Sequence, residues 1–186
     1  MTVHETRQRA ERAARKALQQ FGATELYDMP VDATKLAEYF GTEVFVDDLD
    51  AEALDGFVLI ENGRAEITIN ANQALNRRRF TCAHELGHVF DHREAKTRTD
   101  VGFLDDESTL FLDEGDVAVT KYRDERSRNG SSTEEIYANA FAAAVLMPED
   151  LVRTLHRAHQ SVAQMARFFR VSETAMGYRL ANIGLT

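Results

Sequence analysis

The chain has 186 residues, 44% apolar and 28% charged, a composition typical of a globular protein with a buried core. Its 22 basic and 31 acidic residues give a formal net charge of -9, which excludes a protein that coats nucleic acid by overall positive charge. A single cysteine, Cys82, excludes an intrachain disulfide, and no apolar stretch is long enough to span a bilayer, so we expect a cytoplasmic protein with no membrane association.

The first predicted element is an amphipathic helix over residues 4–21, with small apolar residues on one face and arginines on another. We interpret residues 1–27 as an N-terminal unit whose basic face is solvated. A second helix is predicted to begin at Pro30, with Asp32 as its cap, and to end at Gly41.

A β region follows, with a short strand over 43–46 and a hairpin formed by residues 56–61 and 64–70. The dipeptide Asn62-Gly63 lies between the hairpin strands and favours the positive φ angles of a tight two-residue turn. The apolar period then becomes helical over residues 74–91.

Residues 93–131 are predicted to form a long, irregular, acidic loop. Between residues 99 and 120 the chain has seven carboxylates and no lysine or arginine, so this segment contributes -7 to the net charge. Our hypothesis is that the loop screens the site described below or favours a basic partner.

The remainder is predicted to be helical, with a helix from Thr133 to Met147, a helix over 149–159 and a C-terminal segment over 160–186. This last segment has the proportions of a helix-turn-helix unit.

Direct DNA binding would require basic side chains on the second helix of that unit, where 161–182 offers little beyond Arg179 and Asn182. We therefore favour a packing or substrate-docking role for the C-terminal segment over DNA binding.

The sequence His84-Glu85-Leu86-Gly87-His88 is an H-E-x-x-H motif on a predicted helix. Residues four apart differ by about 40° around a helix, so the two imidazoles project from one face and can bind one ion. Neutral imidazole is a good ligand for Zn²⁺, the expected cofactor. Glu85 is rotated by about 100° from His84 and could accept a proton from zinc-bound water.

Two features argue against a merely solvated helix face. The flanking residues are apolar, so the imidazoles and the carboxylate are expected to be buried and to need partners. Gly87 weakens a helix by about 1 kcal/mol relative to alanine, which is understandable if another segment must approach closely.

A catalytic zinc ion needs a third protein ligand, and Glu135, near the start of the helix after the acidic loop, is our choice. Glu134 is the alternative, and could instead be an exposed charge that complements the helix dipole. Asn139 shares a face with Glu135 and could hold a ligand histidine by its free ring nitrogen, or could bond to backbone at the core edge. His92 continues the histidine spacing, and we expect it to support a ligand or to pack.

Cys82 lies about 200° from His84 around the helix, so it is interpreted as a small buried apolar residue facing away from the metal. No oxyanion partner is identified. Tyr122, Tyr137 and His92 are candidates by residue type alone, and Tyr137 is expected to point away from Glu135.

These pieces, in this order, resemble the ImmA/IrrE-type zinc metallopeptidases over most of residues 28–185. The matching segments are Pro30–Asp32, Ile67–Asn70, Arg79–His88, His92, Glu135–Pro148 and Phe169–Leu180. The resemblance implies an α+β fold, with a zincin-like core over 28–159 in which a small sheet packs on the H-E-x-x-H helix. The chain departs from the family pattern at Cys82, where an aliphatic residue is common, and in its long acidic connection.

The resemblance further implies an intracellular zinc endopeptidase of narrow specificity that cleaves a helix-turn-helix transcriptional repressor in a stress or mobile-element response. It assigns metal binding to His84, His88 and Glu135, and catalysis to Glu85. The alternative is a non-proteolytic regulator that binds a repressor or DNA and has a structural or vestigial metal site. The intact Glu85 favours the peptidase, because a structural site has no use for a general base.

Overall fold

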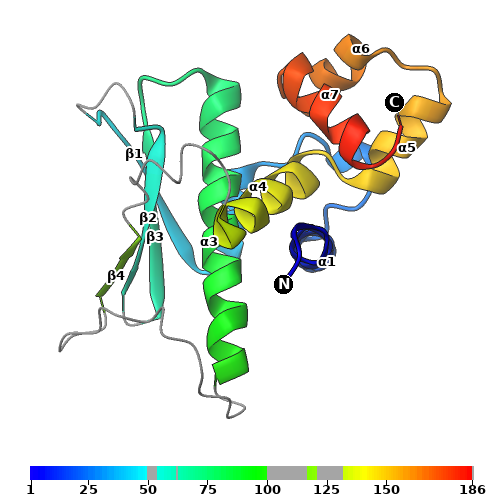
Figure 1. Ribbon diagram of the computed structural model, residues 1–186. Coiled ribbons are helices and arrows are strands. Elements are labelled where there is room, and N and C mark those ends of the chain that lie inside the picture. The colour runs from blue at the N-terminus through cyan, green and yellow to red at the C-terminus, as the bar shows by residue number, and fades with distance from the viewer. Residues whose placement is uncertain (50–53, 62, 100–116, 121–131, 186) are drawn as a thin grey trace.

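A computed structural model describes residues 1–49, 54–61, 63–99, 117–120 and 132–185. The small sheet lies on one side of the long helix α3, and most other helices lie on its opposite side (Figure 1). The elements are α1 (Val3–Phe21), a 3-10 turn (Leu26–Asp28), α2 (Ala33–Tyr39), β1 (Thr42–Asp47), β2 (Gly56–Glu61), β3 (Arg64–Asn70), α3 (Leu75–Thr99), β4 (Val117–Thr120), α4 (Thr133–Leu146), α5 (Glu149–Arg157), α6 (Val162–Phe169) and α7 (Glu173–Asn182). The predicted α+β class is confirmed.

The sheet has four strands in the order β1-β3-β2-β4. β1 runs parallel to β3, and the other neighbours are antiparallel. The predicted hairpin is confirmed, since Glu61 of β2 lies opposite Arg64 of β3. Alternate residues of these strands, including Val58, Ile60 and Ile67, are buried on the face that α3 covers.

The helix that carries the H-E-x-x-H motif is longer than the apolar pattern predicted, because α3 continues to Thr99. No glycine or proline stands between His92 and Thr99, so nothing in the sequence ends the helix where the apolar period ends.

A second correction concerns the remainder of 93–131, which was expected to be irregular throughout. Val117–Thr120 forms β4 and pairs antiparallel with β2 at one edge of the sheet. Its alternating β-branched residues favour a strand, but four residues are too short for the alternation to predict one. Residues 100–116 and 121–131, which contain most of the acidic residues of the predicted loop, lie outside the described residues.

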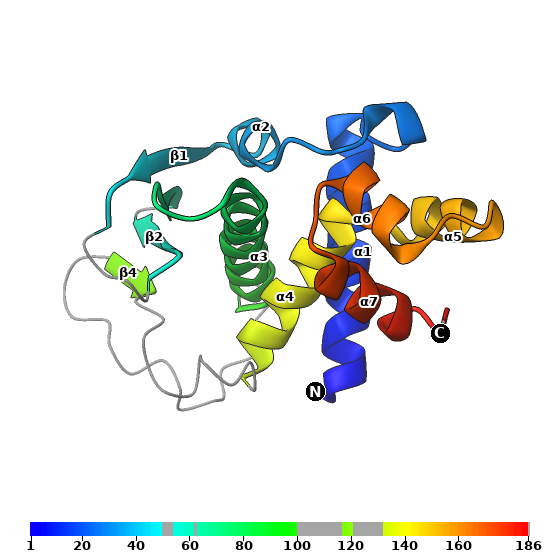
Figure 2. The same cartoon turned by 90° about the horizontal axis from the view of Figure 1, so that it is seen from above.

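The helix α1 is part of the main core rather than an appendage to it. Thr2 and Glu5 form a capping box at its start, and Gly22, at φ +82°, ends it. Ala10, Ala14 and Ala17 are fully buried in the core cluster that also contains residues of α3 and α4. Figure 2 shows α1 passing behind α4 and α7. The division into units 1–27, 28–159 and 160–186 stays a prediction.

The C-terminal helices α6 and α7 are joined at the predicted turn. There the backbone of Arg170 adopts the left-handed conformation, with φ 51°, and Ser172 caps α7. Arg79 of α3 holds this turn by donating hydrogen bonds to the carbonyls of Phe169 and Arg170. Within the described part of the chain, no helix has the length and apolar character that crossing a bilayer requires.

Candidate metal centre

The centre is built where the helices α3 and α4 touch. A Cβ atom on Gly87 would lie 2.9 Å from the Cα of Ala138 and 3.2 Å from its carbonyl oxygen, so a larger residue at this position would push the helices apart. The close approach predicted from Gly87 is therefore present, and its partner is the middle of α4.

The start of α4 sets the position of its glutamates. Ser132, one residue before the predicted cap Thr133, caps the helix, because its Oγ accepts a hydrogen bond of 3.2 Å from the amide of Glu135. Glu135 thus lies in the first turn and is 6% exposed, whereas Glu134 is exposed. The two carboxylates that the sequence left as alternatives are separated by their burial.

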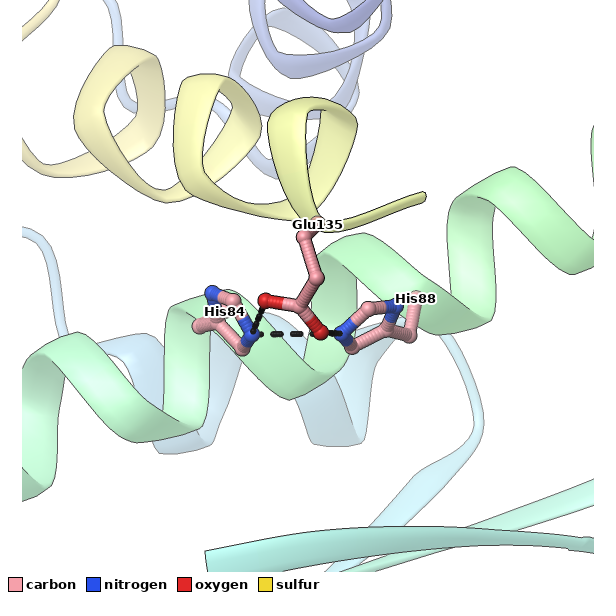
Figure 3. A group of neighbouring side chains, drawn as sticks. All are labelled: His84, His88 and Glu135. Atoms are coloured by element: carbon pink, nitrogen blue, oxygen red, sulfur yellow. Dashed lines mark hydrogen bonds and ion pairs between the residues drawn. The ribbon is translucent and has the colours of Figure 1, made fainter. Parts of the chain in front are cut away.

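Three side chains converge between the helices (Figure 3). The Nε2 atoms of His84 and His88 are 3.1 Å apart. Glu135 bridges them, with one carboxylate oxygen 3.5 Å from Nε2 of His84 and the other 3.4 Å from Nε2 of His88. Among the described residues, these three form the one group of histidine, cysteine and acidic residues with the proximity to hold a metal ion.

The geometry of this group fits a zinc ion. Donors at about 2.0–2.1 Å from a tetrahedral zinc are about 3.3–3.4 Å from one another. The 3.1 Å between the two nitrogens, and the 3.5 and 3.4 Å from each nitrogen to one of the two carboxylate oxygens of Glu135, lie around that value. Two imidazole nitrogens and one carboxylate oxygen are also a known donor set of catalytic zinc, with a fourth position left for water.

The protonation states favour metal binding. Burial, and then the nearby His88, lowers the pKa of His84 to about 4, so its imidazole is neutral and its lone pair is available. Burial raises the pKa of Glu135, but the hydrogen bond with His88 and the charges of both histidines outweigh burial and lower it overall. Glu135 therefore provides a carboxylate at neutral pH.

Glu85 is buried beside this group and is 7% exposed. Burial raises its pKa to about 7, with a further rise from the carboxylates of Glu135 and Asp55 and an opposing effect of His88. A carboxyl group with this pKa can accept a proton and release it again near neutral pH, as a general base and acid must.

Asn139 lies one turn after Glu135 and faces His84. Its side-chain hydrogen bonding acts to raise the pKa of that histidine. The buried Nδ1 of His84 has no hydrogen-bond partner among the described residues. A partner for Nδ1 would fix the orientation of the ring, with Nε2 left for a metal, and Asn139 is the neighbouring side chain that could provide it.

The group is most accessible beside His84. The side chain of His84 is 16% exposed, against 4% for His88 and 7% for Glu135. The next histidine on α3, His92, is exposed and lies outside the group, which disfavours packing, while its role in supporting a ligand stays a prediction.

Sequence reasoning missed two residues near the centre, Asp55 before β2 and Arg77 in the first turn of α3. The Nε of Arg77 donates a hydrogen bond of 2.9 Å to Asp55, whose charge helps to raise the pKa of Glu85. These residues are 22 positions apart in the chain and share no local spacing, so only the packing of α3 on the sheet brings them together.

The remaining candidates lie elsewhere. Tyr137 is fully buried, donates a hydrogen bond to Glu94 and has the guanidinium of Arg9 4.5 Å from its ring centroid, so it points away from Glu135 as predicted. Cys82 is 1% exposed, and burial raises its thiol pKa to about 12, which agrees with an inert core residue. Tyr122 lies outside the described residues.

The C-terminal helices bury the arginine that the less favoured DNA-binding interpretation would have needed. Arg179 of α7 is 2% exposed, donates a hydrogen bond of 2.9 Å to the carbonyl of Met147 and forms an ion pair with Glu11 of α1. A buried and paired arginine cannot contact a phosphate or a base without unpacking the helix, which supports the packing interpretation.

Residues 37–181 match the family Peptidase_M78, described as the IrrE N-terminal-like domain. A solved structure of a Mycobacterium tuberculosis transcriptional regulator has a similar fold, with a TM-score of 0.58 and 16% sequence identity. That likeness covers 96% of this chain but 46% of the regulator, so this chain spans under half of its length. No curated protein matches the chain.

Proposed function

Since the chain belongs to the Peptidase_M78 family of IrrE N-terminal-like domains, we propose that it is a zinc-dependent endopeptidase. In this proposal His84, His88 and Glu135 bind the metal, and Glu85 is the catalytic base. The observation that carries the proposal is the convergence of two Nε2 atoms and a carboxylate, 3.1–3.5 Å apart, beside a buried carboxyl group with a pKa of about 7.

With zinc bound, these three donors would hold a Lewis acid that would polarise the scissile carbonyl and acidify water. Glu85 removes one proton from the attacking water and delivers it to the nitrogen of the leaving amine. The peptide bond is thereby replaced by a carboxylate and an amine, with the addition of one water molecule. Burial of Glu85 supports this role, because it keeps the pKa close to neutral pH.

The proposed substrate is a helix-turn-helix transcriptional repressor, cut inside the cell in a stress or mobile-element response. The resemblance to ImmA/IrrE-type peptidases supports this choice, and the likeness to a transcriptional regulator is compatible with it. The strand β4 lies at one edge of the sheet, where an extended substrate segment could add a further strand through main-chain hydrogen bonds.

The test is cleavage of the repressor encoded beside this chain by zinc-loaded wild type, Glu85→Gln and Glu134→Gln proteins, followed by mass spectrometry. We expect one discrete cut by wild type and by the Glu134→Gln control, which alters an exposed carboxylate of the same helix. Glu85→Gln should keep its zinc and cut about 10²–10⁴-fold more slowly, the usual contribution of a general base.

Equal cleavage by wild type and Glu85→Gln would remove Glu85 from the mechanism. If zinc-loaded wild type cut neither the repressor nor a library of unfolded peptides, the non-proteolytic alternative would replace the peptidase.

A further inference from the structure

A groove of about 660 Å³ lies between the helices α1, α4, α5 and α7. Five arginines and two glutamates line it, which gives a local excess of positive charge in a chain whose net charge is -9. The arginines are Arg7, Arg12, Arg15, Arg153 and Arg179. This basic groove includes the arginine face of the N-terminal helix, to which the sequence assigned no more than solvation.

The two glutamates of the basic groove are already neutralised. Glu11 pairs with Arg179, and Glu149 accepts a hydrogen bond of 2.8 Å from Nε of Arg153. In the part of the chain that the structure describes, Arg7 and Arg12 are exposed and have no hydrogen-bond or ion-pair partner. The positive charge left over is therefore on α1 and is available to a ligand.

The floor of the basic groove is apolar and belongs to α4, the helix that also carries Glu135. Ile136, Ala140 and Ala143 occupy one face of α4, at the spacing of residues that line a helix. Asn139 lies on the same face and also contacts His84, and Ile136 is adjacent to Glu135 in the chain. Asn139 is thus a residue that both lines the groove and lies next to His84 of the metal centre.

We propose that the basic groove binds an acidic segment of the substrate protein and so brings a neighbouring segment of that protein to the metal centre. That the bound protein is a substrate rests on the proposed peptidase function. The binding of an acidic segment does not depend on that function. Guanidinium groups pair with carboxylates in a bidentate geometry, and the apolar floor suits the side chains between them.

The lining favours a peptide over nucleic acid. Single-stranded nucleic acid is usually bound by aromatic side chains on which bases stack, and no phenylalanine, tyrosine or tryptophan is among the described residues that line the groove.

The experiment measures fluorescence anisotropy with Glu85→Gln protein, which binds without cutting. The probe is a labelled peptide of repeated Glu-Leu-Ala-Glu units, and its counterpart has lysine in place of glutamate. We expect saturable binding of the acidic peptide and no binding of its lysine counterpart. Arg7→Glu/Arg12→Glu should weaken binding about tenfold or more, because it reverses both unpaired charges.

The matched control is Lys35→Glu/Arg64→Glu, which makes the same change of charge at two exposed residues of α2 and β3 outside the groove. Its affinity for the peptide should stay within about twofold of the parent, since exposed charges beyond a Debye length are screened. If charge reversal in the groove lowers the thermal midpoint, Arg7→Gln/Arg12→Gln replaces it, with a smaller loss in the same direction.

The proposal is overturned if the acidic peptide does not bind, or if the control pair weakens binding as much as the groove pair. Tighter, arginine-dependent binding of a DNA duplex or single strand would also overturn it and assign the groove to nucleic acid. Cleavage of the repressor is measured separately, so its failure removes the peptidase and leaves acidic-peptide binding in place.

Discussion

The metal centre and the basic groove share the helix α4 but are built in opposite ways. In the metal centre, three donors lie 3.1–3.5 Å apart and are 4–16% exposed. In the basic groove, Arg7 and Arg12 are exposed and have no partner among the described residues. Catalysis requires fixed distances in a desolvated site, whereas recognition of a charged segment requires charge that can reach its partner.

This contrast predicts large effects on metal binding from changes at the metal centre and almost none from changes in the basic groove. The largest effect is expected for Glu135→Gln. Removal of a carboxylate ligand should lower zinc affinity by more than the 10–100-fold typical of losing an outer hydrogen-bond partner. Competition with a fluorescent chelator measures it, with Glu134→Gln as the control. Wild-type affinity in Glu135→Gln would exclude Glu135 as a ligand.

The next effect concerns the contact between α3 and α4. Gly87→Ala places a methyl group 2.9 Å from the Cα of Ala138, so we expect a loss of about 1–3 kcal/mol in the free energy of unfolding. Weaker zinc binding should accompany it, because Glu135 moves away with α4. Urea denaturation of the metal-free protein separates the two effects.

The matched control for this contact is Gly177→Ala in α7, where nothing lies within 4 Å of the added methyl group. Alanine favours a helix over glycine by about 1 kcal/mol, so this variant should be at least as stable as wild type. Equal stability of Gly87→Ala and wild type would show that the helices do not need to be this close.

A smaller effect is expected for Asn139→Ala, which removes a polar side chain next to the ligand His84. Loss of an outer partner of a ligand histidine typically costs 10–100-fold in metal affinity, and we expect about tenfold here. Unchanged zinc affinity, measured by the same chelator competition, would favour the alternative in which Asn139 is a core-edge residue.

The smallest effect is expected for Arg7→Glu/Arg12→Glu. Both residues are exposed and unpaired among the described residues, so the free energy of unfolding should change by less than about 0.5 kcal/mol. Zinc affinity should also be unchanged. A loss of zinc in this variant would mean that the basic groove and the metal centre are one site.

Local spacing explains what the sequence could predict. The four-residue separation of His84 and His88 and the dipeptide Asn62-Gly63 each specify a structure without reference to the remainder of the chain. Glu135 could be proposed because its helix is apolar and must pack on the core. Burial then distinguished it from Glu134, which the sequence could not do.

The parts that the sequence did not predict depend on contacts between distant segments. The strand β4 is defined by its pairing with β2, about sixty residues earlier, rather than by its own four residues. Asp55 and Arg77 meet only after α3 packs on the sheet. The basic groove brings together residues from His4 to Ile183, so no pattern along the chain could reveal it.

The most direct test of the metal centre is anomalous diffraction at the zinc absorption edge from crystals of the zinc-loaded protein. We predict one ion at about 2.0–2.1 Å from the Nε2 atoms of His84 and His88 and from a carboxylate oxygen of Glu135. An anomalous peak at another group of residues, or an ion at this position without Glu135 as a ligand, would contradict the account.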